Sequence, residues 1–280
     1  MRITVVGSIN LDFVASTPAL PRAGETVTGA RLARHPGGKG ANQALAAHKL
    51  GADVSLIGCV GVDEMAGAAM ALLTAHGVQL SGVETDIAEP TGVALIAVDQ
   101  TGENQIVVCA GANHRITSEH LPARIDGPLI VQLELPIATV EAAVGRATGF
   151  VCVNLAPAAP VSNQLLGRAD LLIVNETEAA FYGDLLHRGG GRVVVTQGAR
   201  GAVLYQRGVE LARATPPTVT AVDATGAGDA FVGAICVALL EGMPADQALR
   251  FACAAGALAA TKAGAQPSLP TRAEVESLIG

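Results

Sequence analysis

The sequence is poor in aromatic residues: it has no tryptophan, and aromatic residues make up only 2% of its 280 residues. Proteins that bind single-stranded nucleic acid stack the bases on aromatic side chains, so this composition disfavours such a function. Basic residues are also few, and the net charge of −7 disfavours binding along a phosphate backbone. Backbone amides can still hold a small anion, so these shortages do not exclude a small anionic ligand.

Cysteine and histidine are scarce as well. The five cysteines are scattered through apolar stretches, and neither they nor the six histidines show metal-ligand spacing. We therefore assign no metal or nucleophile chemistry to the histidines. The cysteines are predicted to be reduced and buried, as small apolar side chains of a cytoplasmic protein: Cys59, Cys109, Cys152, Cys236 and Cys253.

Long hydrophobic runs are missing too. The longest, from Ala230 to Leu240, is well short of the ~20 residues that a membrane-spanning helix needs. The acidic Asp12 occurs too early for the start of the chain to match a signal peptide. We therefore predict a soluble protein of the cytoplasm.

What the sequence does contain is an alternation of short β-branched strands and apolar helices, which is typical of an α/β protein with a mostly parallel sheet. The expected strands are residues 3–6, 53–58, 129–133, 151–154, 170–174 and 192–196, with a hairpin of strands 202–206 and 208–213. The expected helices are residues 41–50, 63–76, 137–148, 227–240, 244–262 and 271–278. No repeat, linker or charge run divides the chain, so residues 1–280 are predicted to form a single domain.

Two segments interrupt this alternation. Residues 18–34 carry prolines and glycines around a short strand-like stretch, Glu25 to Gly29. Residues 91–98 and 104–109 alternate as two strands around a hairpin turn at 99–102. We predict that the two segments together form a small sheet outside the main one.

The stretch from Thr220 to Gly233 carries the strongest chemical signal. Its glycines, Gly226 and Gly228, lie between a strand end and a long apolar helix. The first amides of a helix have no partner within it and lie at the positive end of its dipole, so they predict a site for a phosphate or an oxyanion. Asp229 beside that site is suited to taking a proton from a hydroxyl that attacks phosphorus. The alternative is that Asp229 only caps the helix.

Polar residues suited to a polyol occur earlier in the chain. Asn10 and Asp12 alternate in an extended segment after the first strand, where open α/β sheets bind ligands, although an Asx-turn is the alternative. The glycines of Gly37-Gly-Lys-Gly-Ala-Asn42 begin a helix, and their spacing is not that of a Walker motif. Asn42 offers a neutral sugar both a donor and an acceptor, whereas Lys39 is predicted to be solvated or locally paired.

A cation site is expected near Asp223, which lies six residues before Asp229. An uncompensated carboxylate there would repel phosphates, so a counter-charge is expected. The loop from Ala259 to Ser268 is rich in small residues and can turn carbonyls inward. Carbonyls with one carboxylate suit a large monovalent cation better than magnesium, which requires octahedral order. The alternative is that Asp223 only caps the turn through local amides.

Further short motifs complete a pattern that covers nearly the whole chain. In order, the motifs are Gly7-Ser-Ile-Asn-Leu-Asp12, Gly24-Glu-Thr-Val27, Gly37-Gly-Lys-Gly-Ala-Asn42, Thr91-Gly-Val-Ala94, Ala110-Gly-Ala-Asn113, Asn175-Glu-Thr-Glu178, Asp223-Ala-Thr-Gly-Ala-Gly-Asp229 and Gly264-Ala-Gln-Pro-Ser268. With these motifs the sequence resembles the ribokinase-like family of sugar kinases.

The resemblance implies a three-layer α/β/α fold with a small β-sheet lid over the sugar. The lid would be built from roughly residues 13–35 and 91–109, and it would also join two copies into a homodimer. The implied reaction is ATP-dependent phosphorylation of D-ribose at O5, with magnesium and potassium as the ions. A kinase for deoxyribose, another small sugar or a nucleoside is the alternative within the family.

The resemblance also assigns residues by position. The matched sugar-binding residues are Asn10, Leu11, Asp12, Gly38, Lys39, Gly40, Ala41, Asn42, Glu134 and Asp229. The matched ATP-binding residues are Asn175, Thr196, Gln197, Gly198, Ala199, Arg200, Gly201, Gly228, Asp229 and Cys253. Asp229 matches the catalytic base, with Gly226, Ala227 and Gly228 as its anion hole. The potassium positions are Asp223, Thr225, Ala259, Lys262, Gly264 and Ser268, and Glu178 matches a residue that acts indirectly on magnesium.

For several of these residues, an ordinary structural role is the alternative interpretation. Glu134 could be a helix cap or a surface charge, Asn175 and Glu178 could be ordinary first-turn residues, and Arg200 could be a solvated loop residue. Two departures from the family pattern concern the nucleotide half: the segment between Phe181 and Arg192 is short, and Cys253 replaces a polar residue.

Two other classes of function compete with the kinase. A catalytically silent sugar-binding regulator could lose Asp229 or the Gly-Ala-Gly turn, but this chain keeps both. A dinucleotide-dependent oxidoreductase is disfavoured, because no Gly-x-Gly-x-x-Gly follows the first strand.

Overall fold

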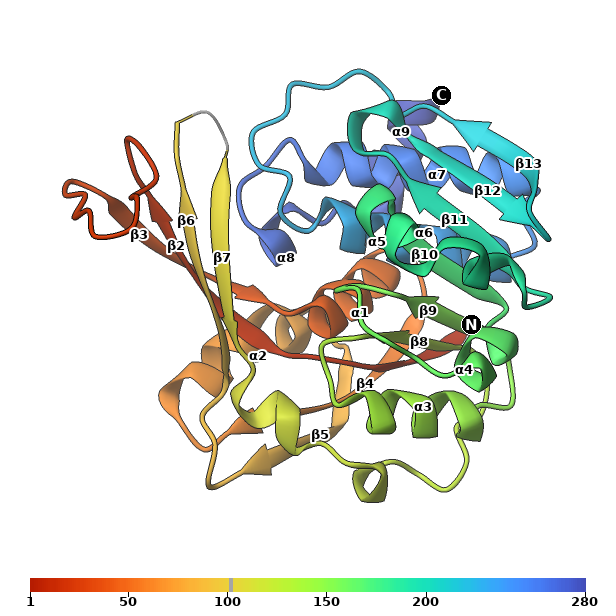
Figure 1. Ribbon diagram of the computed structural model, residues 1–280, viewed down its shortest axis with the longest axis horizontal. Helices are drawn as coiled ribbons and strands as arrows, with labels where there is room; N and C mark the ends of the chain where they lie inside the picture. The colour runs from red at the N-terminus through yellow and green to blue at the C-terminus, as the bar shows by residue number, and fades with distance from the viewer. Residues whose placement is uncertain (101–102) are drawn as a thin grey trace.

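The computed structural model describes residues 1–100 and 103–280, which form a large sheet between two layers of helices and a separate small sheet (Figure 1). The large sheet has nine strands, in the order β13 (Val209–Ala214), β12 (Ala202–Gln206), β11 (Arg192–Thr196), β10 (Leu171–Asn175), β9 (Val151–Asn154), β8 (Leu129–Gln132), β1 (Arg2–Val6), β4 (Asp53–Gly61) and β5 (Gln79–Asp86). Neighbouring strands from β11 to β5 are parallel, whereas β12 is antiparallel to both of its neighbours, β11 and β13. The predicted three-layer fold class is confirmed.

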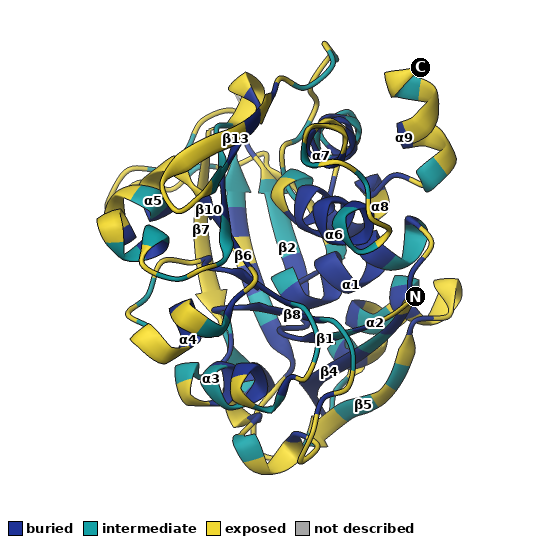
Figure 2. Ribbon diagram, turned by 90° about the vertical axis from the view of Figure 1, so that its right-hand side faces the viewer, coloured by how far each residue is buried: buried dark blue, intermediate teal, exposed yellow. Residues whose placement is uncertain are grey.

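The sheet divides the apolar core into two clusters, one under each layer of helices. One layer contains α1 (Lys39–Lys49), α2 (Glu64–His76), α6 (Ala227–Leu240), α7 (Ala245–Ala259) and α9 (Arg272–Ile279). The other contains α3 (Ile137–Arg146), α4 (Asn163–Arg168), α5 (Glu176–Tyr182) and the 3₁₀ turns η1 (Gly111–Arg115), η2 (Ser118–His120) and η3 (Gly183–His187). Figure 2 shows α6 almost wholly buried at the centre of its layer.

The small sheet has four strands, in the order β3 (Arg31–Gly37), β2 (Asn10–Ser16), β6 (Gly92–Val98) and β7 (Asn104–Cys109). Sequence analysis predicted this second sheet, but placed the strand of its first segment wrongly. Glu25 to Gly29 forms no strand, and the strand that pairs with β2 is residues 31–37. Part of the predicted turn at 99–102 lies outside the described residues. Figure 1 shows the small sheet projecting from the layered body beside the start of α1.

Other elements were missed because their sequence signal is weak. The edge strand β5 is mostly polar and half-exposed, and α4 has only six residues. Cys109 was predicted to be buried but is exposed at the end of the edge strand β7. The other four cysteines are buried as expected. Thr271 and Glu274 form a capping box at the start of α9, the helix expected at 271–278.

Glycines let α1 and α6 approach the sheet and each other. A β-carbon on Gly40 would lie 2.4 Å from the carbonyl carbon of Gly7, so α1 can begin directly against the end of β1 only with glycine there. A β-carbon on Gly233 would lie 2.7 Å from the β-carbon of Ala46, which ties α6 closely to α1. The first turns of both helices are thereby held at the carboxyl ends of the parallel strands. None of the described helices is long and apolar enough to cross a membrane.

Candidate active site

Asp229 lies in the first turn of α6 and is only 7% exposed. Its carboxylate accepts one hydrogen bond on each oxygen, both from the start of α1. Asn42 Nδ2 donates to Oδ2 at 2.8 Å, and Gln43 Nε2 donates to Oδ1 at 2.9 Å. The carboxylate does not cap its own helix through its side chain, so the alternative reading of Asp229 is wrong.

The turn before Asp229 leaves backbone amides open. Gly226 has φ 79°, and a β-carbon on it would lie 2.9 Å from the Cα of Ala265, so glycine is required there on both counts. Around Gly228 the space is open, and among the described residues neither its amide nor that of Gly226 has an acceptor. The amide of Ala227, between them, donates to the Ala224 carbonyl at 3.1 Å. The open amides and the space beside them fit an anionic phosphate group.

Three more predicted sugar-binding residues, Asn10, Asp12 and Asn42, are buried polar residues. Asp12, on β2, is 6% exposed, and burial together with the negative charges of Glu134 and Asp229 raises its pKa to about 7. Asn10 is held by Asn113, whose Nδ2 donates to Asn10 Oδ1 at 2.8 Å. Asn42 Oδ1 is buried and has no hydrogen-bond partner among the described residues, so it has the capacity to accept one more hydrogen bond.

Glu134 follows β8 and bridges β1 and α1. Its Oε2 accepts hydrogen bonds from Ser8 Oγ at 2.5 Å and from the Lys39 amide at 3.1 Å. Ser8 Oγ in turn accepts from the Gly40 amide at 3.3 Å. Glu134 therefore caps a helix, as the alternative interpretation predicted, but the helix that it caps is α1, at the centre of the site.

The prediction that Lys39 is solvated or locally paired is wrong. Its ammonium lies in the field of three carboxylates, those of Asp229, Glu134 and Glu178. Desolvation by itself lowers the pKa of Lys39, but these three negative charges outweigh it and raise the pKa above its ordinary value. A cation kept at this point balances the carboxylates and can also attract a phosphoryl group.

Most of the residues predicted to bind ATP lie at the ends of β10 and β11. Asn175 and Glu178 form a capping box at the start of α5, each side chain accepting from the other's backbone amide. Thr196 ends β11, and residues 197–201 turn through the short helix η4 (Gly198–Arg200). Arg200, exposed on that turn, forms an ion pair with Glu176. These hydrogen bonds fit the alternative interpretation, in which Asn175 and Glu178 are ordinary residues of a helix start.

The two departures from the family pattern lie in this half of the molecule. Cys253 is 5% exposed, and its thiol lies against the Ala214 carbonyl, beneath β13 and not in an open groove. The shortened segment after Phe181 forms the turn η3, whose His187 ring packs edge-on against Tyr205 at 5.8 Å.

The loop before the Gly-Ala-Gly turn holds Asp223 firmly. Its Oδ1 accepts from the Thr225 amide and hydroxyl, and its Oδ2 accepts from the Gly264 amide at 2.8 Å. Burial alone would raise the pKa of Asp223, but these bonds bring it below its ordinary value. Lys262 directs its ammonium to Glu274, away from this carboxylate. The described residues contain no group of three acidic, histidine or cysteine side chains that could hold a metal ion.

Sequence reasoning missed the side chains that hold the predicted ones in place. These are Ser8, Gln43, Asn113, Gln132 and Asn154. A signal did exist: each is a polar residue in or directly beside an apolar segment or motif that was already singled out. What the sequence lacked was the pairing, since the partners lie far apart in the chain.

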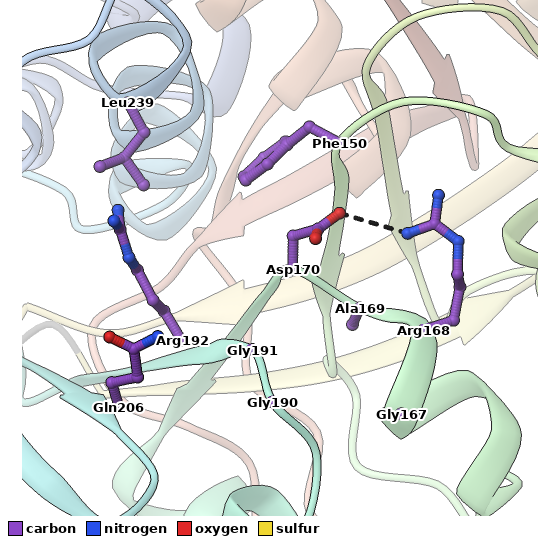
Figure 3. A pocket seen from close by; sticks show the side chains of 10 residues that line it. All are labelled: Phe150, Gly167, Arg168, Ala169, Asp170, Gly190, Gly191, Arg192, Gln206 and Leu239. Carbon is purple, nitrogen blue, oxygen red and sulfur yellow. Dashed lines mark hydrogen bonds and ion pairs between the residues drawn. The ribbon is translucent and has the colours of Figure 1, made fainter.

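A separate hollow of about 510 Å³ lies at the opposite edge of the sheet, at the amino ends of β9 to β11 (Figure 3). Arg168 and Asp170 form an ion pair there, and Arg168 also donates to the Ala147 and Gly149 carbonyls. These bonds join the loops that enter the strands. The hollow is thus remote from Asp229, which lies at the carboxyl ends.

The fold and site together define a class of protein. A buried carboxylate beside open helix-start amides, with further buried polar side chains nearby, suits an enzyme that transfers a phosphoryl group to a hydroxyl. Comparison with known families agrees with this class, since the model of the pfkB family of carbohydrate kinases matches residues 1–272. The chain therefore belongs to the pfkB family, and the resemblance inferred from its motifs is confirmed.

Relatives match over almost the full length. The ribokinase of Haemophilus influenzae is 38% identical over 97% of this chain and 96% of its own length. Among solved structures, the ribokinase of Thermotoga maritima superposes with a TM-score of 0.87 at 33% identity, covering 99% of this chain and 98% of its own. The Arabidopsis thaliana ribokinase in complex with ribose and ATP gives 0.84 at 30% identity, with coverage of 99% and 98%.

Proposed function

We propose that this protein is an ATP-dependent sugar kinase that phosphorylates D-ribose at O5, giving D-ribose 5-phosphate. The observation that carries the proposal is the buried Asp229 carboxylate, placed between Asn42 and the open amides of α6. The substrate is inferred from relatives, because the similar proteins named above are ribokinases and one of them was solved with ribose and ATP.

The chemistry follows from the residues around Asp229. Asn10, Asp12, Asn42 and Glu134 bind the sugar hydroxyls, and the O5 hydroxyl gives its proton to Asp229 as O5 attacks the γ-phosphorus. The new O5–P bond forms while the bond from that phosphorus to the β–γ bridging oxygen breaks, and ADP leaves. Lys39 and the Gly226 and Gly228 amides stabilise the negative charge of the group in transit.

Magnesium, when bound with ATP, would neutralise the phosphates. Glu178 fits only an indirect role towards it, because Glu178 Oε2 is already occupied by the Asn175 amide. Burial raises the pKa of Glu178, although that amide and Lys39 work against the shift. We also propose the cytoplasm as the compartment, as the scattered cysteines of the sequence indicated.

The deciding experiment is a panel of sugars and nucleosides incubated with ATP and magnesium, with ADP release as the measurement. We expect ribose to give the highest kcat/KM. Preference for deoxyribose, another sugar or a nucleoside would favour the alternative within the family. Sugar binding without any ADP release would favour the silent regulator.

The small sheet supports the proposal of a homodimer. Strand register places Leu32, Val93, Leu95 and Val107 on one face of it, and Asp12 on the other. Leu32, Leu95 and Val107 are 63%, 49% and 60% exposed. The face with Asp12 covers the sugar site, so the apolar face points away from it. A second copy of the same sheet would bury this surface. Val27 is the other apolar residue of these two segments that we expect a second copy to cover, and it lies outside the strands.

We expect sedimentation to show a dimer at micromolar concentration, and Val107→Lys to shift it to a monomer. A buried lysine in a symmetric interface would face its own copy, which places two like charges in an apolar contact. Val209→Lys, an exposed apolar residue on β13 of similar exposure, is the matched control and should leave the dimer intact. A fully active wild-type monomer at this concentration would contradict the proposal.

Potassium activation is proposed for the loop around Asp223. This carboxylate lies directly before the Gly226–Gly228 turn and is tied to Gly264 across the loop. Its oxygens and the nearby backbone carbonyls suit a large, weakly hydrated cation, and they would be joined by Thr225, Ala259, Lys262 and Ser268, several of them through main-chain oxygen. A cation there would order the turn without touching the sugar.

Replacing potassium by sodium, and then by a quaternary ammonium ion, should therefore lower turnover several-fold and change the sugar KM less. The assay uses saturating sugar and magnesium-ATP, so that binding is not limiting. Ionic strength is matched across the three salts as the control. Equal turnover in all three would leave Asp223 with its turn-capping role alone.

A further inference from the structure

A chain of buried amide side chains leads from the main sheet to Asp229. Gln132, on β8, donates from Nε2 to Gln43 Oε1 at 2.7 Å. Gln43, on α1, donates from Nε2 both to Asp229 Oδ1 at 2.9 Å and to Asn154 Oδ1 at 3.0 Å. Asn154, at the end of β9, is anchored by its own donation to the Ile173 carbonyl on β10. Gln43 and Gln132 are 0% exposed.

We propose that Gln43 is a positioning residue for the phosphoryl transfer: it anchors Asp229 Oδ1, so that Oδ2 is the oxygen that takes the proton from the sugar. This inference rests on the function proposed above and deepens it. It assigns separate tasks to the two carboxylate oxygens and gives a role to three side chains that do not touch the substrate.

The amide of Gln43 has a single favourable orientation. Its Nε2 faces two acceptor oxygens, those of Asp229 and Asn154, while its Oε1 faces a donor, Gln132 Nε2. A flipped amide would oppose oxygen to two oxygens and nitrogen to nitrogen, in a site closed to water. The low-dielectric surroundings make such mismatches costly, so the donor is held towards Oδ1.

Among the described residues, the acceptor left without a partner lies on the side of Oδ2. Oδ2 is bonded by Asn42, whose own Oδ1 is buried and has no partner. A hydroxyl placed between them could donate to one of these oxygens and be aligned by the other. Oδ1 has the fully buried Gln43 on its side, with Gln132 and Asn154 packed behind it. The geometry therefore leaves Oδ2 as the acceptor.

The same bonds set the balance between carboxylate and carboxylic acid. Neither amide donor can accept a hydrogen bond from a protonated Asp229, so both favour the ionised form. Burial is the largest influence, and it raises the pKa of Asp229. The charge of Lys39 and the hydrogen bonds from Asn42 and Gln43 lower this pKa, whereas the negative charge of Glu134 raises it. Asp12 is the other carboxyl that interacts with this group, from β2.

Replacing Gln43 tests the inference. Gln43→Leu keeps the volume and removes the donor, and we expect kcat to fall by ~10–10² while the sugar dissociation constant stays near that of the wild type. The low-pH limb of the kcat profile should move to higher pH, because the carboxylate has lost a donor. Gln132→Met removes only the donor that fixes the orientation of the Gln43 amide. It should change kcat and the low-pH limb in the same direction as Gln43→Leu, but to a smaller extent.

A second readout does not depend on turnover. Carboxyl-carbon NMR titration of the ligand-free protein, with Asp229→Asn to assign the signal, should show a higher Asp229 pKa in Gln43→Leu. If that variant does not fold, Gln43→Glu and Gln132→Met replace it in both measurements. Leu45→Ala is the matched control: it truncates another fully buried side chain of α1 that does not contact Asp229, and it should lower the melting temperature without moving the pH limb.

The inference is overturned if Gln43→Leu keeps the wild-type kcat and pH profile. It is equally overturned if Leu45→Ala reproduces both changes, because the effect would then be a loss of stability. Failure of the proposed function is a different result: the wild type would phosphorylate no sugar, while the NMR titration would still report whether Gln43 controls Asp229.

Discussion

Asp229→Asn should lower kcat by ~10²–10⁴, the range that a general base contributes, and leave sugar binding largely intact. The amide cannot take the O5 proton, and its own donor would face an N–H from either Asn42 or Gln43. Calorimetry with ribose alone and steady-state kinetics with magnesium-ATP separate binding from turnover.

A loss of folding must be separated from a loss of the base. Asp246→Asn makes the same chemical change at an exposed residue of α7, whose ion pair with Arg250 lies on the surface, and it should leave kcat unchanged. The melting temperature of Asp229→Asn shows how much of the protein is folded in the assay. Near-normal turnover of the folded variant would remove Asp229 from its role and with it the centre of the proposed mechanism.

Asp12→Asn should raise the ribose KM by ~10–10², because a charged acceptor for the sugar hydroxyls is lost. In the wild type the same loss should occur on acidification: the raised pKa of Asp12, about 7, means that the carboxylate becomes protonated as the pH falls through neutrality. The ribose KM of the wild type should therefore rise below this pH, and that of Asp12→Asn should depend on pH less.

Stability should depend on pH in the opposite sense to sugar binding: in the wild type, acidification weakens ribose binding but raises the free energy of unfolding. In the unfolded chain Asp12 loses its proton near its ordinary pKa of 3.8, whereas the folded protein keeps that proton up to about 7. The contribution of this group to the free energy of unfolding is therefore fully present below the unfolded pKa and is lost as the pH rises through the folded one.

Asp12→Asn removes this loss, so above about pH 8 the variant should be the more stable protein, by up to ~4 kcal/mol. At low pH the difference should disappear. Thermal melts across the pH range measure it, with the exposed Asp53→Asn as control. A variant that is less stable than the wild type at high pH would show that Asp12 is not strained by burial.

The potassium and dimer proposals depend on different parts of the structure. Asp223 is bonded by Thr225 and Gly264, so its loop is already ordered, and a cation can only add to that order. The apolar face of the small sheet, in contrast, has no cover within the described chain. The two measurements are therefore independent of each other.

Much of this architecture was determined by the sequence alone. Buried parallel strands such as Leu171–Asn175 are short continuous apolar runs, and Asp229 follows a Gly-Ala-Gly turn that only a helix start explains. Local signals of this kind depend on neighbouring residues, and so they predicted the fold class, the second sheet and most of the residues around Asp229. The strand at 31–37 was missed because its partner, β2, and not its own polar sequence, makes it a strand.

Only the tertiary structure decided how the charges and amides of the site are paired. The residues next to Lys39 in the sequence do not show whether its ammonium is solvated or lies close to the carboxylates of Asp229, Glu134 and Glu178. Gln43 and Asp229 are 186 residues apart in the chain, but in the fold Gln43 Nε2 lies 2.9 Å from Asp229 Oδ1. The physical reason is that a hydrogen bond or a shifted pKa depends on distance and burial, which arise only when α1, α6 and the ends of β1, β8 and β9 come together.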